Sequence, residues 1–206
     1  ITIEAGMRDV SGDKQHAFST HATSGAGSES GIGVAGALAI TISTADVRAG
    51  IATGGTVTLA DGSDGNTDIG EFKITAGEDA QNTAKAEPTV SGDDFGFGAS
   101  VAFAIPTHRV TAEVEDDAVI NGADDVTVLA KSNLDVDSYA KAGVKAGVAI
   151  SPVVAVSMVD TTTLARVGAG SSILAGNLSI TADHTGNSES HADGSVESTD
   201  AAIGLS

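Results

Sequence analysis

Large and small apolar residues alternate along three stretches of this chain. Residues 31–51, 94–114 and 147–167 align with one another without a gap. One set of alternate positions carries Ile, Val, Leu, Phe or Met, and most positions between them carry Gly, Ala, Ser or Thr. A period of two is typical of β-strands, whereas a helix has a period near 3.6. The pattern therefore predicts an all-β fold.

The alignment also predicts how the strands lie relative to one another. If successive copies stack in parallel, like residues lie over like, and Ile40, Phe103 and Val156 form one column. We expect such columns to fill the inside of a tube, because burying an Ile or Leu side chain contributes roughly 1.5–3 kcal/mol. On the same reasoning Phe95 and Phe97 are expected to point inward.

The small residues are then expected to form an outer face. A solvated strand face usually carries Lys, Glu or Thr, whereas this one is almost free of charge. So flat a face permits close approach of a neighbouring solenoid or of another sheet of the same chain. An exposed face without a partner is the simpler alternative. The residues predicted to mediate self-association are Ala35, Ala39, Ala102 and Ala155.

A recurring strand-like phrase divides the chain into repeats. The phrase begins at Ile1, Phe72, Val126 and Leu178. The spacings are therefore 71, 54 and 52 residues, and a weak match at a shift of 25 residues suggests roughly two coils per unit. We expect one β-solenoid segment over residues 1–206, cut from a longer chain. Its units are predicted at about 1–71, 72–125 and 126–177, with a partial unit at 178–206.

Each apolar stretch is expected to bend once. The aligned residues Gly36, Ala99 and Pro152 lie near the middle of the three copies. Proline lacks the N–H that a ladder needs, and glycine inside a strand pattern marks bends or bulges. We therefore predict two strands of about five residues that meet at a corner in each copy.

Composition excludes several classes of protein. The formal net charge is −18, which argues against nucleic acid or an anionic membrane as a partner. Hydrophobic residues make up 41% of the chain, too many for a disordered acidic tail. The apolar runs 31–42 and 147–159 are shorter than the roughly 20 residues of a membrane helix, so no membrane span is expected. The chain has no cysteine, which excludes disulfides and thiolate metal sites.

The best candidate for a metal site is an acidic, glycine-rich loop. Its alternating oxygen ligands suit calcium, although Ile69 and Thr75 stand where an EF-hand needs Gly and Glu. A plain solvated acidic loop is the alternative interpretation. The predicted ligands are Asp61, Asp64, Asn66 and Asp68.

The sequence offers little for catalysis. The five histidines show no zinc-binding spacing, and no serine lies in a Gly-x-Ser-x-Gly elbow. His108 shares a column with Ala45 and Thr161, which are ordinary surface residues. A polysaccharide-acting β-helix would need aromatic platforms, and the expected inward orientation of the phenylalanines does not supply them. We therefore predict a protein that is not an enzyme and has no certain cofactor.

Three phrases resemble the repeat regions of large bacterial secreted or surface proteins. They are GIGVAGALAI at 31–40, FGASVAFAI at 97–105 and VTVLAK at 126–131. Their Ala-Val strands and Gly-Asn or Gly-Asp turns are similar to leukotoxin-type filamentous adhesins and filamentous-haemagglutinin-like β-solenoids. The resemblance implies a right-handed parallel β-helix, an extracellular or cell-surface location, and a role in adhesion or filaments.

The expected function follows from the repeats and the resemblance together. We predict a structural segment of a fibre, stalk or surface filament that self-associates into fibres or lateral bundles, with a host or neighbouring cell surface as a further partner. Two alternatives stay open: a scaffold that calcium stabilises, and a β-helix that acts on polysaccharides.

Overall fold

The computed structural model describes residues 1–7, 11–27, 31–59 and 70–206. Within these residues the chain forms nine strands and no helix, so the predicted all-β class is confirmed. The strands are β1 (Thr2–Gly6), β2 (His16–Gly27), β3 (Ile32–Ile51), β4 (Thr56–Thr58), β5 (Glu71–Ser91), β6 (Phe95–Val114), β7 (Val119–Ser157), β8 (Asp160–Val167) and β9 (Ser172–Leu205).

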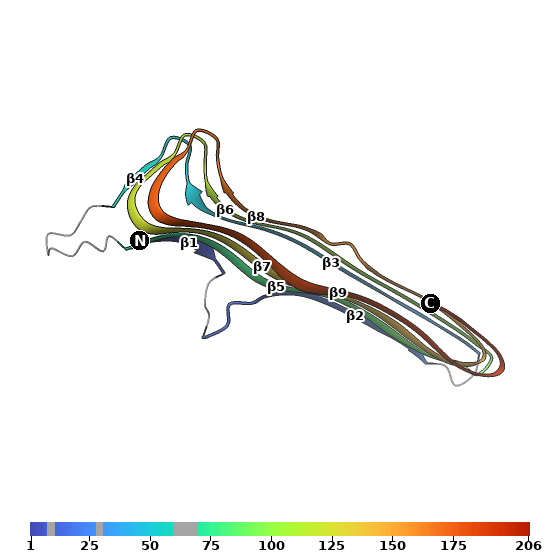
Figure 1. Ribbon diagram of the computed structural model, residues 1–206. Helices are drawn as coiled ribbons and strands as arrows, with labels where there is room; N and C mark the ends of the chain where they lie inside the picture. The colour runs from blue at the N-terminus through green and yellow to red at the C-terminus, as the bar shows by residue number, and fades with distance from the viewer. Residues whose placement is uncertain (8–10, 28–30, 60–69) are drawn as a thin grey trace.

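The nine strands form one sheet in which every pairing is parallel. Each turn of the chain runs along one wall, reverses at a narrow end, returns along a second wall and closes through a wide end (Figure 1). The first wall consists of β1, β2, β5, residues 126–146 of β7, and residues 178–198 of β9. The second wall consists of β3, β6, residues 148–157 of β7, β8, and residues 201–205 of β9, which pair with residues 148–152 of β7. The architecture is solenoid-like, with successive layers stacked along one direction.

The strand register confirms the alignment of the repeats. Ile40 pairs with Phe103, and Phe103 pairs with Val156, as the stacked columns require. The expectation of two coils per unit is wrong. Phe72 pairs with Val126, 54 residues later, and Val126 pairs with Leu178, 52 residues later. A unit fills both walls in one long circuit, because its strands continue for about 20 residues instead of turning after five.

The predicted corner is also absent from the described strands. β3 continues from Ile32 to Ile51 through Gly36, and β6 continues through Ala99. Both small residues point outward, where the backbone needs no bend. At Pro152 the chain stays extended, and the only local effect is that the pairing of β7 with β6 skips this residue and Ser151. Loss of the proline N–H accounts for this interruption.

The orientation of the alternating residues is the reverse of the one predicted. In β3 the small residues face the interior, and Ala39 is 0% exposed. The large residues face solvent, and Ile40 is 45% exposed. In β6 the side chains of Phe95, Phe97 and Phe103 also lie on the outward positions, so their predicted inward orientation is wrong.

Small residues face inward because the two walls lie very close together. The hydroxyl of Ser100 donates to the carbonyl of Ala86 on the opposite wall at 2.7 Å, and Thr41 Oγ1 donates to the carbonyl of Thr83 at 2.7 Å. A Cβ atom added to Gly96 would lie 2.6 Å from a methyl group of Val144. The narrow part therefore holds mostly Ala, Gly and Ser, with a few larger apolar side chains such as Leu134, Val136 and Val153.

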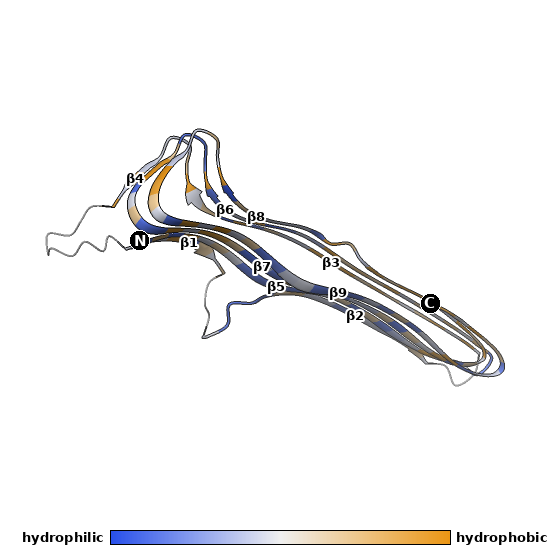
Figure 2. Cartoon of the chain, in the orientation of Figure 1, coloured by the Kyte–Doolittle hydropathy of each residue, from blue (hydrophilic) through white to orange (hydrophobic). Residues whose placement is uncertain are grey.

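Large apolar side chains fill the interior at the wide end instead. Phe72, Ile74, Val114, Ile120 and Val128 belong to one buried cluster there. Along the curved wide end, orange segments stand between blue ones in the hydropathy colouring (Figure 2). The largest buried apolar cluster of the described residues thus lies at the wide end, and two smaller clusters lie between the walls elsewhere.

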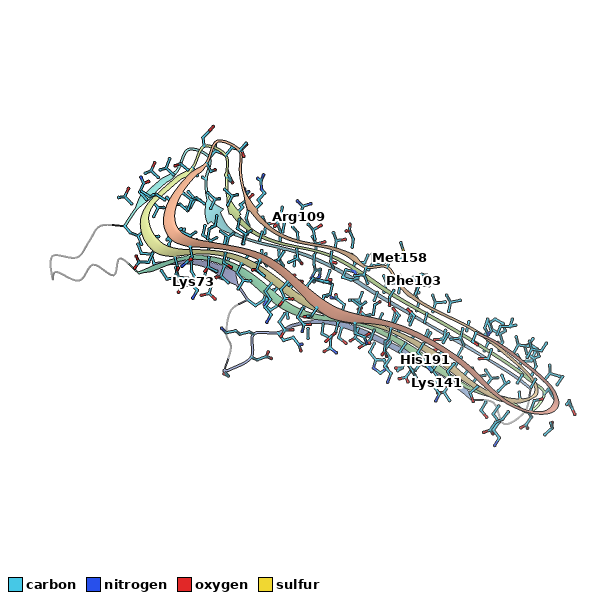
Figure 3. The ribbon with its side chains drawn as sticks, viewed as in Figure 1. Lys73, Phe103, Arg109, Lys141, Met158 and His191 are labelled. Atoms are coloured by element: carbon cyan, nitrogen blue, oxygen red, sulfur yellow. The ribbon has the colours of Figure 1, made fainter. Side chains whose placement is uncertain are left out.

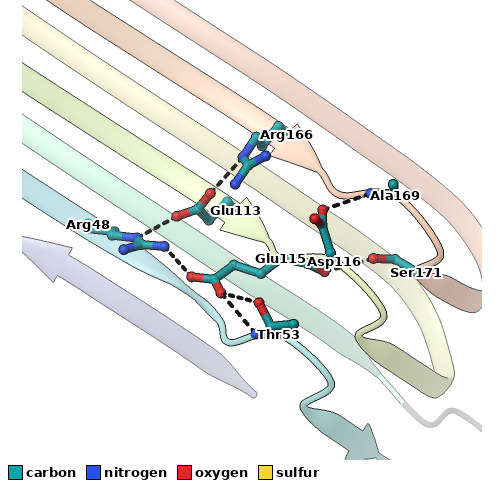
Figure 4. Close-up of polar contacts among 8 residues, drawn as sticks. All are labelled: Arg48, Thr53, Glu113, Glu115, Asp116, Arg166, Ala169 and Ser171. Atoms are coloured by element: carbon teal, nitrogen blue, oxygen red, sulfur yellow. Dashed lines mark hydrogen bonds and ion pairs between the residues drawn. The ribbon is translucent and has the colours of Figure 1, made fainter.

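Polar contacts tie the loops of the wide end from layer to layer (Figure 4). Thr53 donates from its backbone nitrogen and its hydroxyl to Glu115, at 2.9 and 2.8 Å. These bonds lower the pKa of Glu115. Asp116 accepts from the nitrogen of Ala169 at 2.9 Å, and Ser171 donates to the carbonyl of Glu115 at 2.8 Å. The loops therefore repeat in register like the strands.

Candidate functional site

The most distinctive surface of the molecule is the outer side of the second wall. We call it the outer apolar face. Three layers each contribute five large apolar side chains to it, and Phe103 and Met158 are seen on this side in Figure 3. The residues are Ile32, Val34, Leu38, Ile40 and Ile42 of β3, Phe95, Phe97, Val101, Phe103 and Ile105 of β6, and Val148, Ile150, Val154, Val156 and Met158 in the third layer.

No outward position of this face within residues 32–42, 95–105 and 148–158 carries a charged side chain. The side chains are accessible: Ile42 is 70% exposed and Met158 is 58% exposed. The three layers span about 36 Å along the strands and about 14 Å across them, or roughly 500 Å² in projection. Contiguous exposed apolar patches of this size are often functional in soluble proteins.

The residues predicted to mediate self-association lie on the other side of the same wall. Ala39 and Ala102 are 0% exposed, and Ala35 and Ala155 also occupy inward positions. These four residues therefore do not form an outer face, and the prediction that placed association on them is wrong. The wall was identified correctly, but its two sides were exchanged.

The outward positions of the first wall are polar and charged. Lys73, Lys141 and His191 lie along this wall in Figure 3. Tyr139 stacks on His191 with ring centroids 5.2 Å apart, and Lys141 Nζ lies 3.7 Å from Asp193. The two outer sides of the solenoid thus differ sharply in chemistry, which gives the molecule one solvated side and one apolar side.

A polar cluster is enclosed between the walls. His108 Nδ1 lies 2.6 Å from Glu78 Oε1, and both side chains are fully buried. Ser43 Oγ lies 2.8 Å from His108 Nε2 and 2.5 Å from Asn82 Oδ1. Serine has one hydroxyl hydrogen, so when it donates to Asn82 the imidazole donates to Ser43 through Nε2. The other nitrogen of His108, Nδ1, faces the Glu78 carboxylate.

This cluster connects the walls across the interior. Ser43 and His108 belong to the second wall, and Glu78 and Asn82 belong to the first. A hydroxyl, an imidazole and a carboxylate in line is an arrangement used to activate serine nucleophiles. Here the hydroxyl is enclosed by both walls, so the arrangement is suited to holding them together.

Sequence reasoning placed His108 on the surface, and the structure corrects this. A signal for the facing of the first wall lies in its sequence, where Ala80, Ala84 and Ala86 alternate with charged residues such as Lys85 and Glu87. Because unpaired charges must face water, the small residues of that wall have to face inward. In this layer the inward positions are even-numbered in both walls, whereas they change from even to odd between the walls in the layer before and the layer after, so the facing of the first wall alone does not place His108.

One carboxylate bridges two layers on the outer side near the wide end (Figure 4). Glu113 forms ion pairs with Arg48 of β3 and with Nε of Arg166 of β8, the latter at 2.7 Å. The hydrogen bond to Glu113 raises the pKa of Arg166. Arg48 also pairs with Glu115. This network links three successive layers next to the outer apolar face.

The predicted calcium ligands Asp61, Asp64, Asn66 and Asp68 lie outside the described residues. Within the ranges that the structure does describe, no group of three or more His, Asp or Glu side chains converges as a metal site.

Among the described residues there is also no helix with the length and apolarity that crossing a membrane requires. A comparison of the chain with known proteins finds no matching family model, no matching curated protein and no matching solved structure.

Proposed function

We propose that this chain is a structural, non-enzymatic segment of an extracellular bacterial repeat protein, in which it forms part of a fibre, stalk or surface filament. In this proposal the solenoid is a right-handed parallel β-helix, and each unit of 52–54 residues makes one turn. The location rests on the resemblance to filamentous adhesins and related β-solenoids.

The observation that carries the proposal is the stacking of repeats in one register. The same 20-residue ladder joins β3 to β6, from Ile32 with Phe95 to Ile51 with Val114. β7 and β8 continue it in the next layer. Each further unit adds the same backbone pairing on the same side, so the architecture extends along one axis by repetition. Growth of this kind suits a spacer or fibre.

The interior supports the same proposal. Its narrow part is lined mostly by Ala, Gly and Ser, together with Leu134, Val136 and Val153, and hydroxyl groups such as that of Ser100 bond to the opposite wall. Two sheets held this closely along their length make a thin, stiff section. The buried ion pair of Glu78 and His108 joins the walls further along the same section.

The proposal is tested by adding units to the chain. One or two extra copies of residues 126–177 are inserted after residue 177. Each copy is expected to lengthen the particle by about 4.8 Å along the stacking direction. It should also raise the melting temperature, because each new interface adds stability. Small-angle X-ray scattering and thermal melts measure both quantities.

A matched control inserts a shuffled sequence of the same composition, which should add neither length nor stability. Particles whose length does not increase with the true copies would contradict the proposal. Antibody labelling of intact, unpermeabilised cells that produce the parent protein tests the extracellular location separately.

A further inference from the structure

We propose that the outer apolar face binds the same face of a second copy of this chain, so that two solenoids pack side by side in opposite strand directions. This inference rests on the proposed structural function and names its partner. The contact surface predicted from the sequence was the face of small residues, which the structure buries. The surface proposed here is the face of large residues on the other side of the same wall.

The size of the face fits a dimer. Covering about 500 Å² on each of two copies buries about 1,000 Å² in total, which is near the lower limit for a specific interface. The rows of side chains repeat about every 6.8 Å along each strand and about every 4.8 Å between layers, so two such faces present matching corrugations. Face-to-face packing of sheets at about 10 Å is the ordinary way in which such surfaces are buried.

Charge favours a second copy in this orientation. Two chains with a net charge of −18 repel each other strongly, and the outward side of the first wall carries many of the charged residues. Pairing through the outer apolar face directs both polar walls to the outside, where water and salt screen them. The contact then brings together residues 32–42, 95–105 and 148–158 of the two molecules, whose outward positions carry no charge.

Two exposed charges in one layer offer a way to set the register, although Arg109 also has Asp46 as its neighbour in the ladder of β3 and β6. Asp93 lies eight positions before Val101 and Arg109 lies eight positions after it. Both residues are exposed, and neither has an ion-pair partner within the described part of its own chain. Figure 3 shows Arg109 on the side of the outer apolar face.

A two-fold axis through Val101 then brings the end of each copy that carries Asp93 next to the end of the other that carries Arg109. Such an interface is isologous, because each copy contributes the same surface. It is also closed, with one acidic and one basic residue matched at each end of the apolar contact.

The first test measures self-association of the full 206-residue chain by sedimentation equilibrium. The wild-type chain is expected to form a dimer at micromolar concentrations. Ile40→Lys with Val154→Lys should weaken the dimer at least tenfold, because both side chains lie in the centre of the contact. The control Thr75→Lys adds a charge at an outward position of the first wall and should leave the dimer unchanged. A monomeric wild-type chain, or an unchanged dimer in the double variant, would overturn the proposal.

The second test examines the register. Asp93→Arg and Arg109→Asp should each weaken the dimer, and the double exchange should restore it. Loss of the dimer in the single variants without recovery in the double variant would overturn the antiparallel register. Binding of the face to lipid vesicles or to glycans, with no dimer, would overturn the second copy as the partner.

Failure of the pairing and failure of the structural function give different results. Particles that lengthen with added units but stay monomeric support the fibre segment and reject the pairing. Circular dichroism and melting of the Ile40→Lys and Val154→Lys chain should match the wild-type monomer, because both side chains face solvent. A dimer that forms in chains that do not lengthen would reject the fibre segment instead.

Discussion

Ile40 and Phe103 are direct partners in the parallel ladder of β3 and β6, and both side chains point away from the interior. Their neighbours Ala39 and Ala102 are also partners, and these are completely buried. The usual assignment of large apolar residues to the inside and small residues to the outside is therefore reversed along this wall. The reversal gives the solenoid a thin interior and an apolar outer side.

Ala102→Leu tests this orientation. The added atoms would enter the narrow space between the walls, so we expect the free energy of unfolding to fall by about 1–3 kcal/mol. Phe103→Leu at the next position should change it by much less, because that side chain faces outward. Urea unfolding of both variants gives the comparison. A larger loss for Phe103→Leu than for Ala102→Leu would show that the large residues are inside.

The order and register of the layers could be predicted from the sequence, because stacking of repeats needs no knowledge of the interior. Alignment of residues 31–51 with 94–114 gave the partner of every residue in β3. Which set of residues faces the interior could not be predicted in the same way. When large and small apolar residues alternate, either set can face inward. Contact with the opposite wall across the interior decides between the two possibilities, as where Gly96 lies against Val144.

The polar cluster was missed for a related reason. Glu78, His108 and Ser43 are far apart in the sequence, and they meet only because the two walls face each other. No short motif joins them. Their burial can be inferred only when it is known which alternate positions of each wall face the interior.

Glu78→Gln is expected to destabilise the fold by roughly 3 kcal/mol. The substitution leaves the His108 imidazole buried without its carboxylate partner, and breaking one side of a buried ion pair is strongly destabilising. Chemical unfolding at neutral pH measures the loss. His108→Gln should cause a similar loss, since it leaves Glu78 unpaired.

The combined variant Glu78→Met with His108→Leu serves as the control. Replacing both members of a buried pair with apolar residues is often neutral, so this variant should recover much of the lost stability. Additive losses in the combined variant would indicate that the two side chains are not coupled.

Glu113→Gln is expected to lower the melting temperature by a few degrees. Glu113 is almost completely buried and lies between Arg48 and Arg166, which belong to layers on either side of it. Removing its charge weakens hydrogen bonds to two guanidinium groups at once. The matched control is Glu197→Gln, because the ion pair of Glu197 with Lys145 is fully solvated and such pairs contribute little. Equal melting temperatures for the two variants would contradict the bridging role.

Asp137→Asn is expected to stabilise the protein at neutral pH. Asp137 pairs with Glu189 in the ladder of β7 and β9, so two carboxylates lie side by side on the first wall. Partial burial, followed by the charges of Glu189 and Asp135, raises the pKa of Asp137 in the folded state. A raised carboxyl pKa favours the folded state at low pH, and this contribution is lost as the pH rises through the raised value.

The gain from Asp137→Asn should therefore be about 0.5 kcal/mol at pH 7 and low salt, as for other like-charged cross-strand pairs. It should shrink when salt screens the repulsion, and it should disappear near pH 3, where the carboxyl group of Asp137 is protonated. Asp183→Asn is the matched control on the same face of β9, because Asp183 pairs with Lys131 and its neutralisation removes an attraction. Thermal melts across this pH range follow both variants. A gain for Asp137→Asn that persists near pH 3 would show that repulsion between ionised carboxylates is not its cause.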